Sequence, residues 1–252
     1  MFRKNTLAMV VGEFLGTGIL SLAVLGLSHS NVGQMPWFIA VSAGLALSIL
    51  VVMLANITGA VFNPALSIGL WTVRKLQSLQ TVAYVLAQFA GAAAAWLLFC
   101  YFTDISIDKI QNKGFTDVNA RIMVAELVGT MIFAMAVASA VYQRVSLGVK
   151  AFVVGAGLTV GALVATLGSG GILNPAVALA VHQFGLWTYV AGSVIGAILG
   201  FNLYNLLFTE TELNTSRPAR VADVKVVKAS APARKAASKK PAARKKTVAK
   251  KK

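Results

Sequence analysis

The sequence contains few charged residues and almost no cysteine or histidine. Only 12% of its 252 residues are charged, whereas 57% are hydrophobic. An ordinary soluble domain has about twice that charged fraction, so the composition excludes one. The single cysteine, Cys100, cannot form an internal disulfide, and the cysteine and histidine residues show no metal-ligand spacing. Because Cys100 lies in an apolar run, we expect it to serve packing alone.

Positive charge is abundant, but it is concentrated at the C-terminal end. Of the 23 Lys and Arg residues, 14 lie from Arg217 onward, where Asp223 is the only acid. The net charge of +15 therefore comes mostly from residues 217–252 and not from the hydrophobic part before them. This segment is rich in Ala, Lys and Pro and cannot bury a core, so it is predicted to be disordered.

Long apolar runs dominate the first 216 residues. A helix that crosses the hydrocarbon core needs about 20 apolar residues. Six stretches reach this length: 7–27, 36–55, 80–102, 121–142, 149–168 and 186–208. The first follows Arg3 and Lys4, as a signal sequence would, but Glu13 interrupts it and no small-residue cleavage site follows. The sequence therefore predicts an all-α membrane protein with six transmembrane helices.

Basic residues in the connections indicate the orientation, because Lys and Arg near span ends favour the cytoplasmic side. The cations at the N-terminus, after the second span, after the fourth span and after the sixth span all fall on one side of the membrane. The connections 28–35 and 169–185 on the other side contain neither Lys nor Arg. We therefore predict a multi-pass protein of the cell membrane with both termini cytoplasmic.

The hydrophobic part contains an internal repeat. Residues 11–17 (VGEFLGT) recur as 124–130 (VAELVGT), and residues 59–65 (GAVFNPA) recur as 170–176 (GGILNPA). Each unit holds three spans, an odd number, so the second begins on the opposite face and the two are related by inversion. The predicted organisation is a first repeat at 1–115, a second repeat at 116–216 and a basic cytoplasmic tail at 217–252.

Each repeat contains an Asn-Pro-Ala segment that predicts the start of a short helix. Asn is a favoured N-cap and Pro is tolerated at the first helical position, so Asn63-Pro64 and Asn174-Pro175 each begin one. The runs that follow are 64–73 and 175–184. They are about half a span long, and irregular backbone at membrane depth is tolerated only inside protein or beside water. Two re-entrant half-helices that meet from opposite faces satisfy this condition.

Half-helices that meet at their N-termini place partial positive charge at the bilayer centre and repel cations. The side-chain amides of Asn63 and Asn174 can donate hydrogen bonds to a passing water or hydroxyl oxygen, which disfavours a continuous proton-conducting chain. An asparagine before proline also caps ordinary helices, but its duplication in an apolar unit favours a pore. The sequence therefore predicts that neutral hydrogen-bonding solutes pass best.

Two Asn-Pro-Ala boxes, six spans, inverted repeats and a Glu-x-x-Gly-Thr sequence in each half resemble the aquaporin and glycerol-facilitator family. The resemblance covers about residues 5–210. It implies passive conduction, one pore per protomer and a homotetramer. It also implies that Glu13 and Glu126 hold the backbone of the re-entrant loops, with a proton relay as the alternative. The pore-motif residues are Asn63, Pro64, Ala65, Asn174, Pro175 and Ala176.

The family's narrowest point is a filter of four positions at fixed offsets from the two asparagines. Here these positions are Ala43, Ala162, Gly171 and Val177. The family usually carries an aromatic residue at the first and nearly always Arg at the last, so this chain departs from the pattern. We expect a wider, uncharged filter that passes small neutral solutes larger than water and discriminates poorly between them. Cation rejection then depends more on the half-helix N-termini.

Two residues near the half-helices bear on the solute and on gating. Glycerol-conducting members of the family typically carry Asp directly after the filter Arg, and here that residue is Ala178. His182 is expected near the C-terminal end of the second half-helix, where the helix dipole favours a polar group or a cation; a pH gate is the alternative.

Two functions from different classes remain open. The leading one is a passive channel for water and small neutral solutes. The alternative is a membrane scaffold with a vestigial pore, whose residues 217–252 tether nucleic acid or anionic lipid by non-specific electrostatic attraction. The sequence shows no nucleophile–base pair, phosphate-binding loop or metal cluster, so we expect no enzymatic activity, cofactor or metal.

Overall fold

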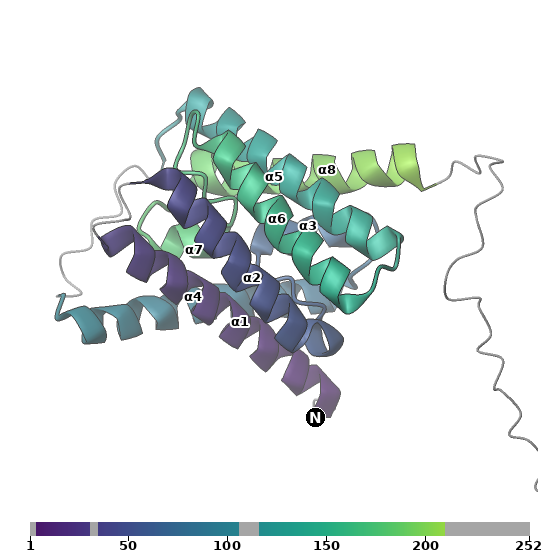
Figure 1. Ribbon diagram of the computed structural model, residues 1–252, viewed down its shortest axis with the longest axis horizontal. Coiled ribbons are helices and arrows are strands. Elements are labelled where there is room, and N and C mark those ends of the chain that lie inside the picture. The colour runs from purple at the N-terminus through teal and green to yellow at the C-terminus, as the bar shows by residue number, and fades with distance from the viewer. Residues whose placement is uncertain (1–3, 31–34, 106–115, 210–252) are drawn as a thin grey trace, which may run out of the picture. The chain divides into compact units, whose positions relative to one another are not determined.

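The computed structural model describes residues 4–30, 35–105 and 116–209 (Figure 1). The chain divides into two units, residues 1–211 and 212–252. The predicted disordered tail at 217–252 lies outside the described residues. The predicted boundary between the repeats, after residue 115, borders a segment that also lies outside them.

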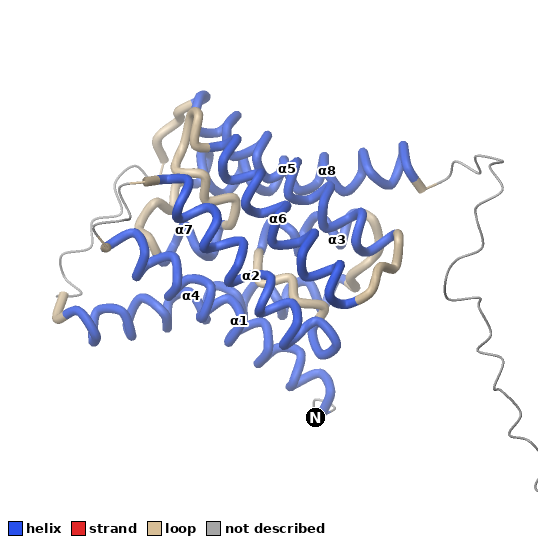
Figure 2. The backbone as a smooth tube through the Cα atoms, in the orientation of Figure 1, coloured by secondary structure: helices blue, strands red, loops and turns tan. Residues whose placement is uncertain are grey.

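Helices and their connecting loops make up the described backbone (Figure 2), and six helical segments are long and apolar enough to cross a membrane. They are α1 (Lys4–His29), α2 (Pro36–Thr58), α4 (Ser78–Thr103), α5 (Ala120–Tyr142), α6 (Leu147–Ala165), and the continuous pair η3 (Leu186–Ala191) and α8 (Gly192–Phe208). Two short helices lie between spans: α3 (Pro64–Thr72) and α7 (Pro175–Ala180). The prediction of six spans is confirmed.

The second half-helix is shorter than the sequence suggested. It was expected over 175–184, but α7 ends at Ala180 because the backbone of His182 turns into the left-handed region with φ of 57°. The N–H of Gln183 then donates to the carbonyl of Ala178 at 2.9 Å and closes the helix end. The first half-helix, α3, ends with the same type of turn, in which the N–H of Lys75 donates to the carbonyl of Leu70.

The two halves of the sequence interlock. Helix α1 packs against α4, α2 against α6, and α5 against α8 (Figure 1). Each half-helix also packs against a spanning helix from the other half: α3 contacts α8, and α7 contacts α4. Neither half therefore completes its own packing alone.

Small residues one turn apart bring helix backbones into contact inside the bundle. Gly91 of α4 lies against the backbone of Phe14 in α1, and Gly196 of α8 lies against the backbone of Leu127 in α5. A side chain at either glycine would collide with main-chain atoms, which cannot move aside as a flexible side chain could. Contacts within one protomer therefore explain why these two residues are small.

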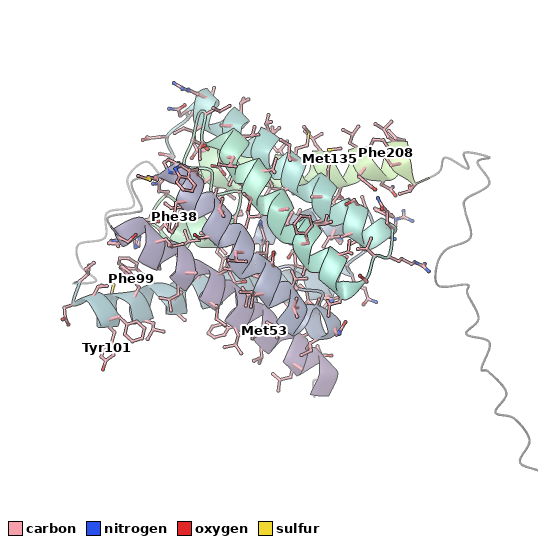
Figure 3. All side chains as sticks on the ribbon, in the orientation of Figure 1. Phe38, Met53, Phe99, Tyr101, Met135 and Phe208 are labelled. Carbon is pink, nitrogen blue, oxygen red and sulfur yellow. The ribbon has the colours of Figure 1, made fainter. Side chains whose placement is uncertain are left out.

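Large apolar side chains cover the outside of the helices. Met53, Tyr101 and Phe208, labelled in Figure 3, are 59%, 78% and 56% exposed. An apolar outer surface of this extent would aggregate in water but matches the chains of a lipid bilayer. The outer surface and the six spans together indicate a multi-pass membrane protein.

A methyl group at Gly196 tests the close contact between α5 and α8. We expect Gly196→Ala to lower the free energy of unfolding by about 1–3 kcal/mol, the usual effect of overpacking. Gly148→Ala is the matched control, because a Cβ at this exposed helical glycine meets nothing within 4 Å. Thermal unfolding of both variants in detergent, followed by circular dichroism, measures the difference. Equal melting temperatures for the two variants would contradict the packing argument.

Candidate functional site

Each half-helix begins at an asparagine that caps it. The side-chain oxygen of Asn63 accepts a hydrogen bond from the N–H of Ala65 at 2.9 Å. The side-chain oxygen of Asn174 accepts one from the N–H of Ala176 at 3.0 Å. Both asparagines have extended backbone and are followed by proline, the combination that starts a helix at this residue.

The same two asparagines join the halves of the chain. Asn63 Nδ2 donates to the carbonyl of Leu173, and Asn174 Nδ2 donates to the carbonyl of Phe62, each at 2.9 Å. These bonds connect residues 110 and 112 positions apart and hold the two helix starts at one point. A side-chain amide has two N–H donors, and no described residue accepts the second one of either asparagine. One donor on each amide therefore remains for a solute.

The first re-entrant loop is held by a buried carboxylate. Glu13 of α1 is 0% exposed, and its two oxygens accept hydrogen bonds from the N–H groups of Val61 at 3.1 Å and Phe62 at 2.7 Å. Phe62 has left-handed backbone, with φ of 50°, so its N–H cannot join a helical hydrogen-bond ladder. Gln88 of α4 donates to the same carboxylate at 2.8 Å.

The second loop has the same arrangement. Glu126 of α5, also 0% exposed, accepts hydrogen bonds from the N–H groups of Ile172 at 3.1 Å and Leu173 at 2.7 Å. Ser169 donates its hydroxyl to this carboxylate at 2.6 Å. Leu173 has left-handed backbone with φ of 55°, which repeats the geometry of the first loop.

Sequence reasoning missed two of these partners. Gln88 is a polar residue within an apolar span, and this alone should have marked it as a candidate for a buried network. Ser169 gave no such signal, because serine is common in loops and its partner lies 43 positions away.

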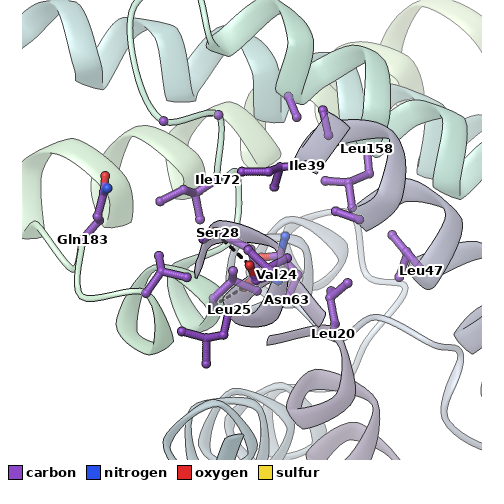
Figure 4. A pocket seen from close by; sticks show the side chains of 18 of the residues that line it. Leu20, Val24, Leu25, Ser28, Ile39, Leu47, Asn63, Leu158, Ile172 and Gln183 are labelled. Atoms are coloured by element: carbon purple, nitrogen blue, oxygen red, sulfur yellow. Dashed lines mark hydrogen bonds between the residues drawn. The ribbon is translucent and has the colours of Figure 1, made fainter. Parts of the chain in front are cut away.

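The side chains of both asparagines line a cavity of about 530 Å³. In Figure 4 Leu20, Val24 and Ile39 lie around Asn63, and all four line the cavity. On α1 the lining runs from Leu20 to His29, a rise of about 14 Å, or about half of a hydrocarbon core. The cavity therefore connects the middle of the bundle with the side where α1 ends.

The four predicted filter positions all line this cavity. Ala43 comes from α2, Ala162 from α6, Gly171 from the second re-entrant loop, and Val177 from α7. Gly171 also has a backbone reason to be glycine, because its φ is 66° and a Cβ would press on the carbonyl of Ala162. None of the four side chains can donate or accept a hydrogen bond.

No aspartate, glutamate, lysine or arginine is found among the described residues that line the cavity. The two histidines of the chain, His29 and His182, are both among them. Burial, with a smaller contribution from repulsion by His29, lowers the pKa of His182 below its ordinary value. His182 lies beyond the last residue of α7 rather than within the helix, and its ring packs against Trp96.

Comparisons with known proteins agree with this architecture. The family model described as "Major intrinsic protein" matches residues 2–217. The chain is 32% identical over 240 residues to aquaporin AqpM of Methanothermobacter marburgensis. The match covers 79% of this chain and 97% of that protein. It is 33% identical over 221 residues to the probable aquaporin NIP7-1 of Arabidopsis thaliana. This match covers 82% of this chain and 79% of that protein.

A solved structure supports the fold. The X-ray structure of the aquaglyceroporin from Plasmodium falciparum matches with a TM-score of 0.64, over 80% of this chain and 96% of that chain. The sequence identity in this match is 21%, so the likeness concerns the arrangement of helices alone.

Replacement of Glu126 by glutamine tests whether the buried carboxylate holds its loop. Glu126→Gln exchanges an acceptor oxygen for an NH₂ group that faces backbone donors. We expect the free energy of unfolding to fall by about 2–4 kcal/mol, since each buried N–H left without an acceptor costs about 1–3 kcal/mol. Ser169→Ala keeps the carboxylate but removes the hydroxyl that donates to it and accepts from the N–H of Gly171, and is expected to cost about 1 kcal/mol. Thermal unfolding in detergent compares them, and wild-type stability for Glu126→Gln would favour the proton-relay alternative.

Proposed function

The chain belongs to the major intrinsic protein family, and we propose that it is a passive channel for water and small neutral solutes with a wide, uncharged filter. The family consists of membrane channels, and the chain has six helices suited to crossing a membrane. The observation that carries the proposal is a single cavity lined by both pore asparagines and by four small or apolar residues at the filter positions.

The asparagine pair allows a solute to pass while it interrupts proton transfer. Asn63 and Asn174 are fixed by their hydrogen bonds to the opposite loop, so their remaining N–H donors are fixed too. A water oxygen that accepts from these donors must turn its own O–H groups away from them on either side. The chain of hydrogen bonds then reverses direction at this point, and a proton cannot hop through it.

The filter residues favour solutes by size and neutrality rather than by specific hydrogen bonds. Ala43, Ala162, Gly171 and Val177 offer no side-chain donor and no charge. A hydroxyl or amide that loses water without a new partner is destabilised by about 1–3 kcal/mol, so a narrow filter of this composition would exclude polar solutes. Small side chains leave room for a partly hydrated solute, which supports passage of polyols and urea-like amides.

Further proposals concern organisation and assembly. The matching pairs Glu13–Phe62 and Glu126–Leu173, both at 2.7 Å, support inverted repeats at 1–115 and 116–216. Cations in the connecting loops support cytoplasmic termini, and the family resemblance supports a homotetramer. The competing proposal, a scaffold with a vestigial pore, assigns the main role to residues 217–252 and their contact with nucleic acid or anionic lipid.

An arginine at position 177 tests the filter assignment. We expect Val177→Arg to reduce glycerol and urea permeability by about tenfold, equivalent to a barrier about 1.4 kcal/mol higher, with a smaller effect on water. Light scattering by proteoliposomes measures the three solutes. Val177→Leu adds bulk without charge, so it is the control that separates the effect of the charge from the effect of size. Unchanged selectivity in Val177→Arg would show that the filter alignment is wrong.

Deletion of residues 217–252 separates the channel from the scaffold. A channel formed by the first 216 residues should keep its water and glycerol permeability in proteoliposomes, while binding to DNA and to vesicles with anionic lipid falls. A full-length protein that conducts neither solute, yet binds DNA or anionic vesicles and loses this binding on truncation, would favour the scaffold.

A further inference from the structure

Lys150 lies in the first turn of α6, on the side of the bundle where α2 ends. Its ammonium group donates a hydrogen bond to the carbonyl of Gly59 at 3.1 Å. Gly59 is the C-cap of α2 and begins the first re-entrant loop, four residues before Asn63. The lysine side chain is partly buried, whereas its hydrogen bond is open to solvent. The bond therefore joins the start of α6 to the start of this loop.

The face of α6 that carries Lys150 is also the face that lines the cavity. Four residues follow one another along this side of the helix at intervals of four: Lys150, Val154, Leu158 and Ala162. Leu158 and Ala162 line the cavity, and Val154 is 3% exposed inside the bundle. The stripe of side chains that contains the filter position Ala162 therefore ends at Lys150.

Helix α2, which packs against α6, has a matching stripe. Ala43 and Leu47 line the cavity, and Thr58 follows Leu47 by eleven residues, about three helical turns, on the same side of the helix. Thr58 is buried, and the residue after it is Gly59, which accepts the hydrogen bond from Lys150. The two stripes that pass the filter and the cavity therefore meet again at Lys150, at the opposite end of the bundle.

Lys150 differs in its surroundings from other cations on this side of the bundle. Arg74, Lys75 and Arg144 are exposed, whereas Lys150 is partly buried. No acidic residue in the described part of the chain forms an ion pair with Lys150. A lysine carries a full positive charge at neutral pH, and a hydrogen bond to an uncharged carbonyl does not cancel it. The place where the two stripes end therefore holds an uncompensated positive charge.

The filter and the cavity have no fixed charge of this kind. The four filter positions are small or apolar, and the described residues that line the cavity include no Asp, Glu, Lys or Arg. Charge selectivity in a pore comes from electrostatic barriers along the path, and a positive group at a mouth is one such barrier to cations. Low-dielectric walls strengthen the repulsion relative to open water. A cation that the filter fails to reject would still meet the charge of Lys150.

We propose that Lys150 is a charge barrier at the mouth of the pore opposite the cavity, and that it supplies cation exclusion that the uncharged filter lacks. This inference rests on the proposed channel function and adds a specificity-determining residue to it. The hydrogen bond to Gly59 holds the ammonium group beside the re-entrant loop, so its charge stays at the mouth. Monovalent metal cations are repelled there, while neutral solutes, which carry no net charge, are affected little.

The ratio of potassium flux to water permeability tests the barrier, with a potassium-sensitive dye and light scattering applied to the same proteoliposomes. We expect Lys150→Met to raise this ratio about tenfold, equivalent to a barrier about 1.4 kcal/mol lower, and Lys150→Glu to raise it further. Lys150→Arg keeps the charge and should keep the wild-type ratio. Arg144→Met is the matched control, because it removes one exposed positive charge from the connection before α6. A wild-type ratio in Lys150→Met, or an equal rise in Arg144→Met, overturns the barrier.

Ionic strength separates the effect of charge from that of a loosened loop. When an impermeant organic salt is added, the Debye length falls from about 10 Å at about 0.1 M to about 3 Å at about 1 M, so the ratios of the wild type and Lys150→Met should converge. A difference that persists at high salt shows that loss of the hydrogen bond to Gly59 opens the mouth, and it overturns the charge barrier.

Water permeability separates this inference from the proposed function. A wild-type protein that conducts water, with the same potassium ratio in Lys150→Met, overturns the charge barrier alone. A wild-type protein that conducts water no faster than protein-free vesicles overturns the proposed channel function, and the barrier with it.

Discussion

The structure depends on one constraint: backbone N–H groups in the middle of a membrane need acceptors from the protein itself. The two re-entrant loops break the helical hydrogen-bond ladder, and Glu13 and Glu126 supply the acceptors that the broken ladder lacks. Each carboxylate receives two backbone N–H groups at the same pair of distances, 3.1 and 2.7 Å. Without them the loops could not stop at mid-depth, and the half-helices could not start there.

The loops in turn hold the two asparagines, whose side chains line the cavity. Each side-chain amide uses its oxygen to cap its own helix and one N–H to hold the opposite loop, which leaves one donor for a solute. The two amides line one end of a cavity whose other described walls are largely apolar and uncharged. The proposed channel for neutral molecules rests on this combination of fixed donors and apolar, uncharged walls.

Much of this arrangement could be predicted from the sequence, because it follows from local rules and from repetition. Apolar run length predicted the six spans, and Asn-Pro predicted where α3 and α7 begin. The end of α7 could not be predicted. Glycine is the residue that usually marks a left-handed turn at a helix end, and here the turn is made by His182. The contact between the rings of Trp96 and His182 could not be predicted either, because the two residues are distant in sequence and no spacing rule connects them.

Permeability of the wild-type protein in proteoliposomes tests the central claim most directly, namely that the cavity and its asparagine pair form an open path for neutral solutes. Light scattering would follow water, glycerol and urea, and a potassium-sensitive dye would follow an ion in the same vesicles. The account predicts that all three neutral solutes cross faster than in protein-free vesicles while potassium does not. Neutral-solute rates equal to those of protein-free vesicles, or a potassium leak of comparable speed, would contradict it.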